Sequence, residues 1–246
     1  PVVVPSRSGQ LDRDGTTTGR VNETTNNSPP RPAQVCCFEP LTTTFAHLAR
    51  TKLEMGWTNE LVLEEAAVSS QPGTIQVQKE LPLGTENVGM DVMQCNEANG
   101  DRCRSIPIFT LNDHVGSLSH KPQIHFLSID VEGYDFDALK GANHILSQQA
   151  HCLEFEYNWK GAWAQQQLQD AVEHLQQQNF ACCWPGRNGH IWRITGCWMD
   201  YCSNRYWANV ACVDGQIPEA RPLAHAMEKR FLETIDISGL VHQRVQ

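Results

Sequence analysis

The alternation of apolar and polar residues predicts a strand–turn–helix unit between residues 124 and 146. A short apolar run, typical of a buried parallel strand, occupies residues 124–129. Asp130, Glu132 and Gly133 follow at once, and glycine allows the backbone to turn sharply. Apolar residues then recur at helical spacing, at Phe136, Leu139, Ala142 and Ile145. The pattern places two carboxylates at the carboxyl end of a strand, where open α/β sheets bind ligands.

The rest of the pattern predicts an α/β sheet whose strand direction changes towards the carboxyl terminus. Neighbouring, mostly parallel strands are expected at residues 35–38, 61–68, 124–129 and 152–157. Residues 74–78 alternate, with Ile75 and Val77 on one face, which predicts a further strand before the central unit. Apolar stretches joined by polar turns predict antiparallel strands at residues 180–184, 190–195 and 207–213. A last helix is expected from about residue 223 to residue 235.

Composition divides the chain into an amino-terminal segment and one domain. Residues 1–34 are rich in Pro, Ser, Thr, Asn and Gly, which cannot bury a core, so a disordered or linker segment is expected there. Residues 35–246 are long enough for one α/β domain. The net charge of −9 argues against a nucleic-acid partner. No apolar run is long enough to span a bilayer.

The cysteines predict disulfides or buried thiols rather than a metal site. Among the ten cysteines, Cys95 and Cys103 flank a polar loop that a disulfide could close. A zinc site would need a cluster, but Cys182, Cys183, Cys197 and Cys202 include no Cys-x-x-Cys pair. Adjacent cysteines in a strand also point to opposite faces. No metal is therefore predicted, and both the cytoplasm and a secretory compartment stay open as locations.

The two carboxylates after residue 129 have two interpretations. Asp130 and Glu132 could simply cap the following helix and favour its dipole. The wider motif favours a functional site, since an Ile-Asp-x-Glu-Gly strand end is followed by a Leu-x-Gly-Ala helix. These positions are filled by Ile129, Asp130, Glu132, Gly133, Leu139, Gly141 and Ala142, with Tyr134 between the two parts. This stretch closely resembles the signature of the FkbM family of S-adenosylmethionine-dependent methyltransferases.

The resemblance implies a Rossmann-like methyltransferase that binds S-adenosylmethionine and methylates a hydroxyl of a small-molecule or glycan acceptor. Glu39 and Pro40 match the family's Phe-Glu-Pro, which implies that Glu39 binds the ribose hydroxyls. Ala67 and Val68 would lie beside the adenine ring. Asp130 and Glu132 are the candidate general bases, and Asp130 could instead orient the cofactor.

Other residues match the family pattern less closely. Residues 110–113 resemble its Thr-Leu-Asp-Asp element, with Asn112 in place of the first acid. Glu154 and Glu156 alternate on one side of the strand at 152–157, either as the acid that the family often has there or as a charge pair on an edge face. The strand at residues 74–78 resembles the antiparallel excursion that usually precedes the central motif in this family. Residues 207–213 resemble the Trp–Asn–Val–Cys ending of eukaryotic-type members.

A first strand followed by a glycine-rich turn, which such an enzyme needs for its cofactor, is not evident. Asp14-Gly15 and Gly19 lack a preceding apolar strand, and the apolar run at residues 2–4 is followed by Pro5. The chain is therefore expected to lack this strand and loop. The alternatives are a non-catalytic binding domain that has lost the loop and a nucleotide-sugar or dinucleotide enzyme. The second is weakened because no glycine fingerprint precedes Glu39.

Overall fold

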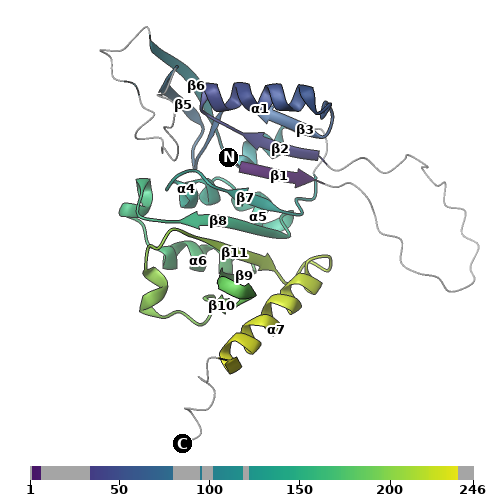
Figure 1. The fold of residues 1–246 in the computed structure, drawn as a ribbon, viewed down its shortest axis with the longest axis vertical. Helices are drawn as coiled ribbons and strands as arrows, with labels where there is room; N and C mark the ends of the chain where they lie inside the picture. The colour runs from purple at the N-terminus through teal and green to yellow at the C-terminus, as the bar shows by residue number, and fades with distance from the viewer. Residues whose placement is uncertain (1, 7–33, 80–94, 96–101, 119–121, 238–246) are drawn as a thin grey trace, which may run out of the picture.

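A large mixed sheet and a small second sheet form the framework of the protein. The computed structural model describes residues 2–6, 34–79, 95, 102–118 and 122–237. The eight strands of the large sheet lie in the order β10-β9-β11-β8-β7-β1-β2-β3, and the three strands of the small sheet in the order β4-β6-β5 (Figure 1).

The strands and helices have the following bounds. The large sheet contains β1 (Val2–Ser6), β2 (Gln34–Phe38), β3 (Leu61–Glu64), β7 (Leu127–Ile129), β8 (Cys152–Tyr157), β9 (Phe180–Pro185), β10 (Ile191–Arg193) and β11 (Ala208–Asp214). The small sheet contains β4 (Ala67–Val68), β5 (Gly73–Gln78) and β6 (Cys103–Phe109). The α-helices are α1 (Thr42–Glu54), α3 (Leu111–Gly116), α4 (Asp135–Lys140), α5 (Asn143–Gln148), α6 (Leu168–Gln176) and α7 (Arg221–Ile237). Short 3-10 helices are η2 (Gly161–Ala164), η3 (Arg187–Gly189) and η4 (Asp200–Ser203).

The strand β1 lies inside the large sheet, between β7 and β2, and is antiparallel to both of these neighbours. Val2 pairs with Phe38 of β2 on one side and with Ile129 of β7 on the other, both antiparallel. The prediction of a sheet without its first strand is thus not confirmed, because β1 fills the central position. The expectation of a mostly parallel arrangement is also corrected. In the large sheet the pairs β2–β3 and β7–β8 are parallel, whereas β1 is antiparallel to both β2 and β7.

The direction of β1 also determines where the chain leaves it. Ser6 pairs with Gln34 at the start of β2, so the chain leaves β1 at the end of the sheet opposite Phe38. The candidate loop at residues 14–19 lies outside the described residues. The expectation of a disordered segment at residues 1–34 is wrong for Val2–Ser6, which form β1. The backbone pairing of β1 covers the edges of β2 and β7, which would otherwise be open.

The other strand predictions had mixed outcomes. The expected strand at residues 61–68 is wrong as a single element, because β3 and β4 belong to different sheets. The strand expected at 124–129 is central, although β7 is shorter and Ile124 makes only an isolated parallel bridge with Ala150. The antiparallel excursion is confirmed, since β5 pairs antiparallel with β6. The antiparallel carboxyl-terminal part is confirmed as well, because β8–β11, β11–β9 and β9–β10 are antiparallel pairs.

The main core lies between one face of the large sheet and α3 to α6. Burial alternates along β8, so Leu153, Phe155 and Tyr157 enter the core while the residues between them are half-buried. Trp163 of η2 is fully buried among these side chains. Towards the lower edge of the sheet in Figure 1, α7 packs on β10 and β11. None of the described helices is long and apolar enough to cross a membrane.

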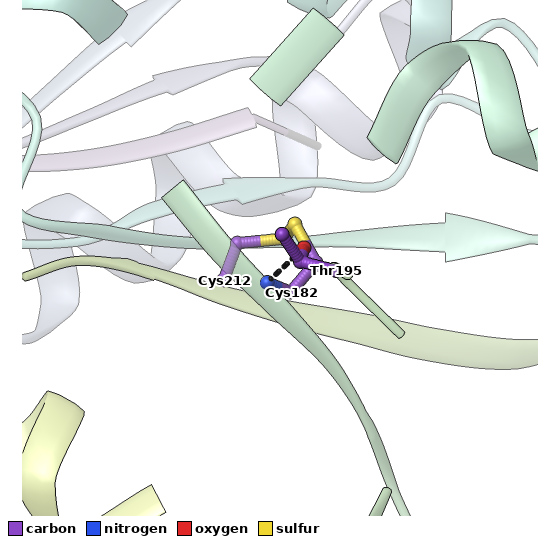
Figure 2. Close-up of a disulfide and its surroundings, with 3 residues drawn as sticks. All are labelled: Cys182, Thr195 and Cys212. Carbon is purple, nitrogen blue, oxygen red and sulfur yellow. Dashed lines mark hydrogen bonds between the residues drawn. A yellow bond between two sulfur atoms is a disulfide. The ribbon is translucent and has the colours of Figure 1, made fainter. Parts of the chain in front are cut away.

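Two disulfides account for four cysteines. Cys182 of β9 bonds to Cys212 of β11, its cross-strand partner, and the Cys182 N–H donates to Thr195 Oγ1 at 2.8 Å (Figure 2). The predicted Cys95–Cys103 disulfide is present. Because Cys182 is bonded to Cys212, its sulfur is not a free thiolate that could bind zinc together with Cys183, Cys197 and Cys202. Among the residues that the structure describes, no group of three His, Cys, Asp or Glu side chains could hold a metal ion.

Gly141 provides a test of the packing between α4 and the loop after β4. A Cβ atom at Gly141 would overlap the backbone carbonyl oxygen of Ser69, which cannot rotate away. We expect Gly141→Ala to lower the free energy of unfolding by about 1–3 kcal/mol, as overpacking of a core does, measured by urea denaturation. Gly116→Ala is the matched control, since a Cβ there meets no atom within 4 Å. Equal stability of the two variants would contradict this packing.

Candidate functional site

The candidate site lies at one end of the large sheet, where β2, β7 and β8 end. Phe38 and Ile129 both flank Val2, so Glu39 and Asp130, which follow them, lie at the same end of the sheet. After Asp130 the chain turns sharply through two residues with left-handed backbone angles, Glu132 (φ 55°) and Gly133 (φ 97°). This conformation is unfavourable for a glutamate, so the surrounding contacts must hold the turn.

The carboxylate of Asp135 holds this turn. Asp135 is fully buried, with no exposed surface. Its Oδ2 accepts from the backbone N–H of Gly133 at 3.2 Å, and its Oδ1 accepts from those of Val131 and Glu156, each at 3.4 Å. The side chain therefore links the end of β7, the turn and β8. Sequence reasoning missed this residue, although an aspartate at the first helical position after a turn is a common acceptor for turn amides.

The surroundings of Asp135 disfavour the ionised form of its side chain. Burial raises the pKa of Asp135 to about 7, hydrogen bonds from backbone amides act in the lowering direction, and the nearby Asp130 and Glu156 carboxylates raise it further. The residue therefore titrates near neutrality in the folded protein.

Asp130 and Glu132 lie in different environments. Asp130 is half-buried, and none of the described residues forms a hydrogen bond or ion pair with its side chain. Glu132 Oε2 is 2.9 Å from Lys160 Nζ, and both side chains are mostly covered. The Lys160 ammonium also lies 4.1 Å from the centroid of the Trp207 ring. Among the described residues, Glu132 thus has an ion-pair partner, whereas Asp130 has none.

Glu156 is the further acid of the site. It lies on β8, which is flanked by β7 and β11 and is therefore an inner strand of the sheet. The Glu156 carboxylate accepts from Asn158 Nδ2 at 2.6 Å and from Trp207 Nε1. Burial raises the pKa of Glu156, the charge of Asp130 raises it further, and these hydrogen bonds lower it.

The predicted cofactor residues lie beside Glu39. Only 6% of the surface of Glu39 is exposed, and its Oε1 accepts from the Leu41 N–H at 2.7 Å. Burial raises the pKa of Glu39, while the Leu41 amide lowers it. Ala67 is buried in a small apolar cluster against which Leu41 packs, whereas Val68 belongs to the main core. Pro40, between Glu39 and Leu41, is half-buried. A buried carboxylate beside small apolar residues could hold a ribose and an adenine.

A cavity beside β2 does not include the predicted site residues. It is lined by Gln34, Cys36, Phe38, Val62, Leu111, His114, Val115, Leu118 and Pro122. Cys36 Sγ lies 3.5 Å from His114 Nε2, an arrangement that could suggest a nucleophile and its base. Burial, followed by the charge of Glu64, raises the pKa of Cys36 to about 12, so the thiol stays protonated and unreactive.

The family model of the methyltransferase FkbM domain matches residues 35–182, which include Glu39, the β7 turn and Glu156. The chain therefore belongs to the FkbM methyltransferase family. A search of curated proteins and a search of solved structures found no match. The match begins within β2, so β1 of this FkbM protein lies outside the family domain, as do β10, β11 and α7.

The structure gives physical reasons for several residues of the FkbM motif. A Cβ atom at Gly133 would overlap the backbone carbonyl of Lys160, so this turn requires glycine. Asn112 Oδ1 accepts from the N–H groups of His144 and Ile145 at 3.0 and 3.2 Å. Asn112 is thus a capping residue of α5, a structural task that an amide oxygen performs as well as a carboxylate does.

The pKa of Asp135 predicts a pH dependence of stability. Its folded-state pKa of about 7 lies above the ordinary aspartate value, so its contribution to stability is full below about pH 4 and is lost as the pH rises through 7. We expect the free energy of unfolding of wild type relative to Asp135→Asn to fall by a few kcal/mol between pH 4 and 8. Urea denaturation of both proteins across this range measures the difference. A constant difference would contradict the raised pKa.

Proposed function

We propose that this FkbM protein is an S-adenosylmethionine-dependent O-methyltransferase whose acceptor is a hydroxyl of a sugar or small metabolite. One observation carries the proposal: Asp130 follows β7 at the same end of the sheet as the buried Glu39, and its carboxylate has no hydrogen-bond partner among the described residues. Membership of the family supports the reaction class. The neighbouring acids argue against an anionic acceptor.

The cofactor would lie across the ends of β2 and β7. S-adenosylmethionine, when bound, supplies a methyl group on a positively charged sulfur. Glu39 Oε1 already accepts from Leu41, and Oε2 has no hydrogen bond among the described residues, so it is available to a ribose hydroxyl. Pro40, Ala67 and Val68 would provide the apolar surface for the adenine. The described residues contain no strand followed by a glycine-rich turn for the methionine portion.

Asp130 is the proposed general base. An acceptor hydroxyl must lose its proton as its oxygen becomes methylated, and a carboxylate within hydrogen-bond reach can take that proton. Asp130 has lone pairs free for a hydroxyl, because no described group donates to it. Glu132 is proposed to act beside it by holding Lys160, with which it forms an ion pair. The Asp135 hydrogen bonds fix the turn on which both acids lie.

Variants at Glu39 test the cofactor site. We expect Glu39→Gln to weaken binding of S-adenosylmethionine by about 1.5–3 kcal/mol, the range for a hydrogen bond to a charged group, while its amide oxygen still accepts from Leu41. Isothermal titration calorimetry measures the affinity, and Glu54→Gln on the exposed part of α1 is the control. Unchanged affinity in Glu39→Gln would remove the ribose role. A wild type that binds no cofactor would instead favour a non-catalytic domain.

Variants at the two acids test the base. Asp130→Asn keeps the shape and removes basicity, so turnover should fall roughly 10²–10⁴-fold with little change in cofactor affinity. Glu132→Gln should reduce turnover less, because it only releases Lys160. Transfer of a labelled methyl group to a panel of glycosides and small alcohols measures both. Near-normal turnover in Asp130→Asn would show that Asp130 is not the base, and a loss confined to Glu132→Gln would assign that role to Glu132.

A further inference from the structure

Two tryptophans form an exposed aromatic pair next to the candidate base. The rings of Trp159 and Trp207 are perpendicular, with centroids 5.2 Å apart. Exposed fractions of 53% for Trp159 and 38% for Trp207 leave much of both side chains open to solvent. Trp159 follows β8 and Trp207 precedes β11, which is antiparallel to β8, so both lie at the end of the sheet where Asp130 lies.

The Trp207 ring is held in place although it is exposed. Its backbone adopts a left-handed conformation (φ 57°), which is unfavourable for a bulky residue. Its indole N–H donates to Glu156, and Lys160 Nζ lies over its ring at 4.1 Å. Strained residues persist only where the surroundings determine them, and they cluster at binding sites. A fixed, exposed aromatic surface beside a candidate base therefore suggests a ligand subsite.

The charges around the pair restrict what can bind there. A cation could bind to the Trp207 ring or to the Glu132 carboxylate, but the Lys160 ammonium already contacts both groups. A second cation would be repelled by the Lys160 ammonium. An anion would meet the carboxylates of Asp130 and Glu156, and the charge of Asp130 already raises the pKa of Glu156. A neutral ligand avoids both penalties.

We propose that Trp159 and Trp207 form the acceptor subsite of this FkbM protein and that the apolar face of a neutral sugar ring stacks there with a hydroxyl directed to Asp130. A sugar ring has a C–H face that suits the electron-rich face of an indole and an edge of hydroxyls that suits carboxylates. This inference rests on the proposed function, because it assigns the acceptor of the same site. It excludes uronic acids and amino sugars as preferred acceptors.

Titrations of the full chain with simple glycosides test the subsite. Methyl glycosides of neutral hexoses are the probes, with a methyl glucuronoside as the anionic and a methyl glucosaminide as the cationic comparison. Binding is followed by nuclear magnetic resonance, through the indole N–H signals. We expect neutral probes to shift the Trp159 and Trp207 signals and to bind about tenfold or more tightly than the charged probes.

Three variants separate stacking from a structural role. Trp159→Ala should weaken neutral-probe binding about tenfold or more, and Trp159→Phe should retain most of the affinity because a ring remains. Trp57→Ala is the control, since Trp57 is also exposed but precedes β3 at the opposite end of the sheet. Wild-type affinity in Trp159→Ala would overturn the subsite, as would a response to neutral probes no stronger than to charged ones.

Calorimetry with S-adenosylmethionine on the same samples distinguishes failure of the inference from failure of the proposed function. Cofactor binding without any indole response to neutral glycosides would overturn the acceptor subsite alone. An indole response that Trp159→Ala abolishes, in a protein that binds no cofactor, would overturn the methyltransferase and support Trp159 and Trp207 as a sugar-binding surface. Binding of both ligands, with each variant affecting only its own, would support the two proposals together.

Discussion

The geometry of the candidate site depends on one buried carboxylate. Asp135 accepts from three backbone amides, and these belong to the end of β7, to the turn and to β8. A buried amide without an acceptor is costly, so the carboxylate and the turn stabilise each other. The unfavourable left-handed angle of Glu132 is tolerated within this arrangement. The acid that holds the turn, Asp135, is therefore distinct from Asp130 and Glu132, the two acids that lie on it.

The site concentrates negative charge and contains one closely bound cation. Besides burial, the carboxylates of Asp130 and Glu156 raise the pKa of Asp135, and the carboxylate of Asp130 raises the pKa of Glu156. Lys160 compensates for Glu132 and at the same time contacts the Trp207 ring. One side chain thus couples the charge of the turn to the aromatic pair. Loss of the Glu132 carboxylate would therefore alter the contact of Lys160 with Trp207, although these residues are far apart in the sequence.

Local patterns predicted the features that depend on neighbouring residues. The central strand, the acidic turn, the β5 excursion and the Cys95–Cys103 disulfide follow from alternation, glycine and cysteine spacing. The direction of β1 depends on the open edges of β2 and β7, which no local pattern encodes. The split of residues 61–68 into two sheets also depends on tertiary pairing. The contacts of Trp207 with Glu156 and Lys160 join segments that are distant in the sequence, so no local pattern indicated a site there.

The reversed central strand has a consequence for the cooperativity of the fold. The pairs β2–β3 and β7–β8 share no direct strand pairing, and the five residues of β1 join them. Detachment of β1 would expose the facing edges of β2 and β7 in a single event, so amide protons on both edges would exchange with solvent together. Two open edges of this kind are also a template for strands of other chains. A strand that precedes the residues matched by the family model thus covers two edges at which other chains would otherwise be able to pair.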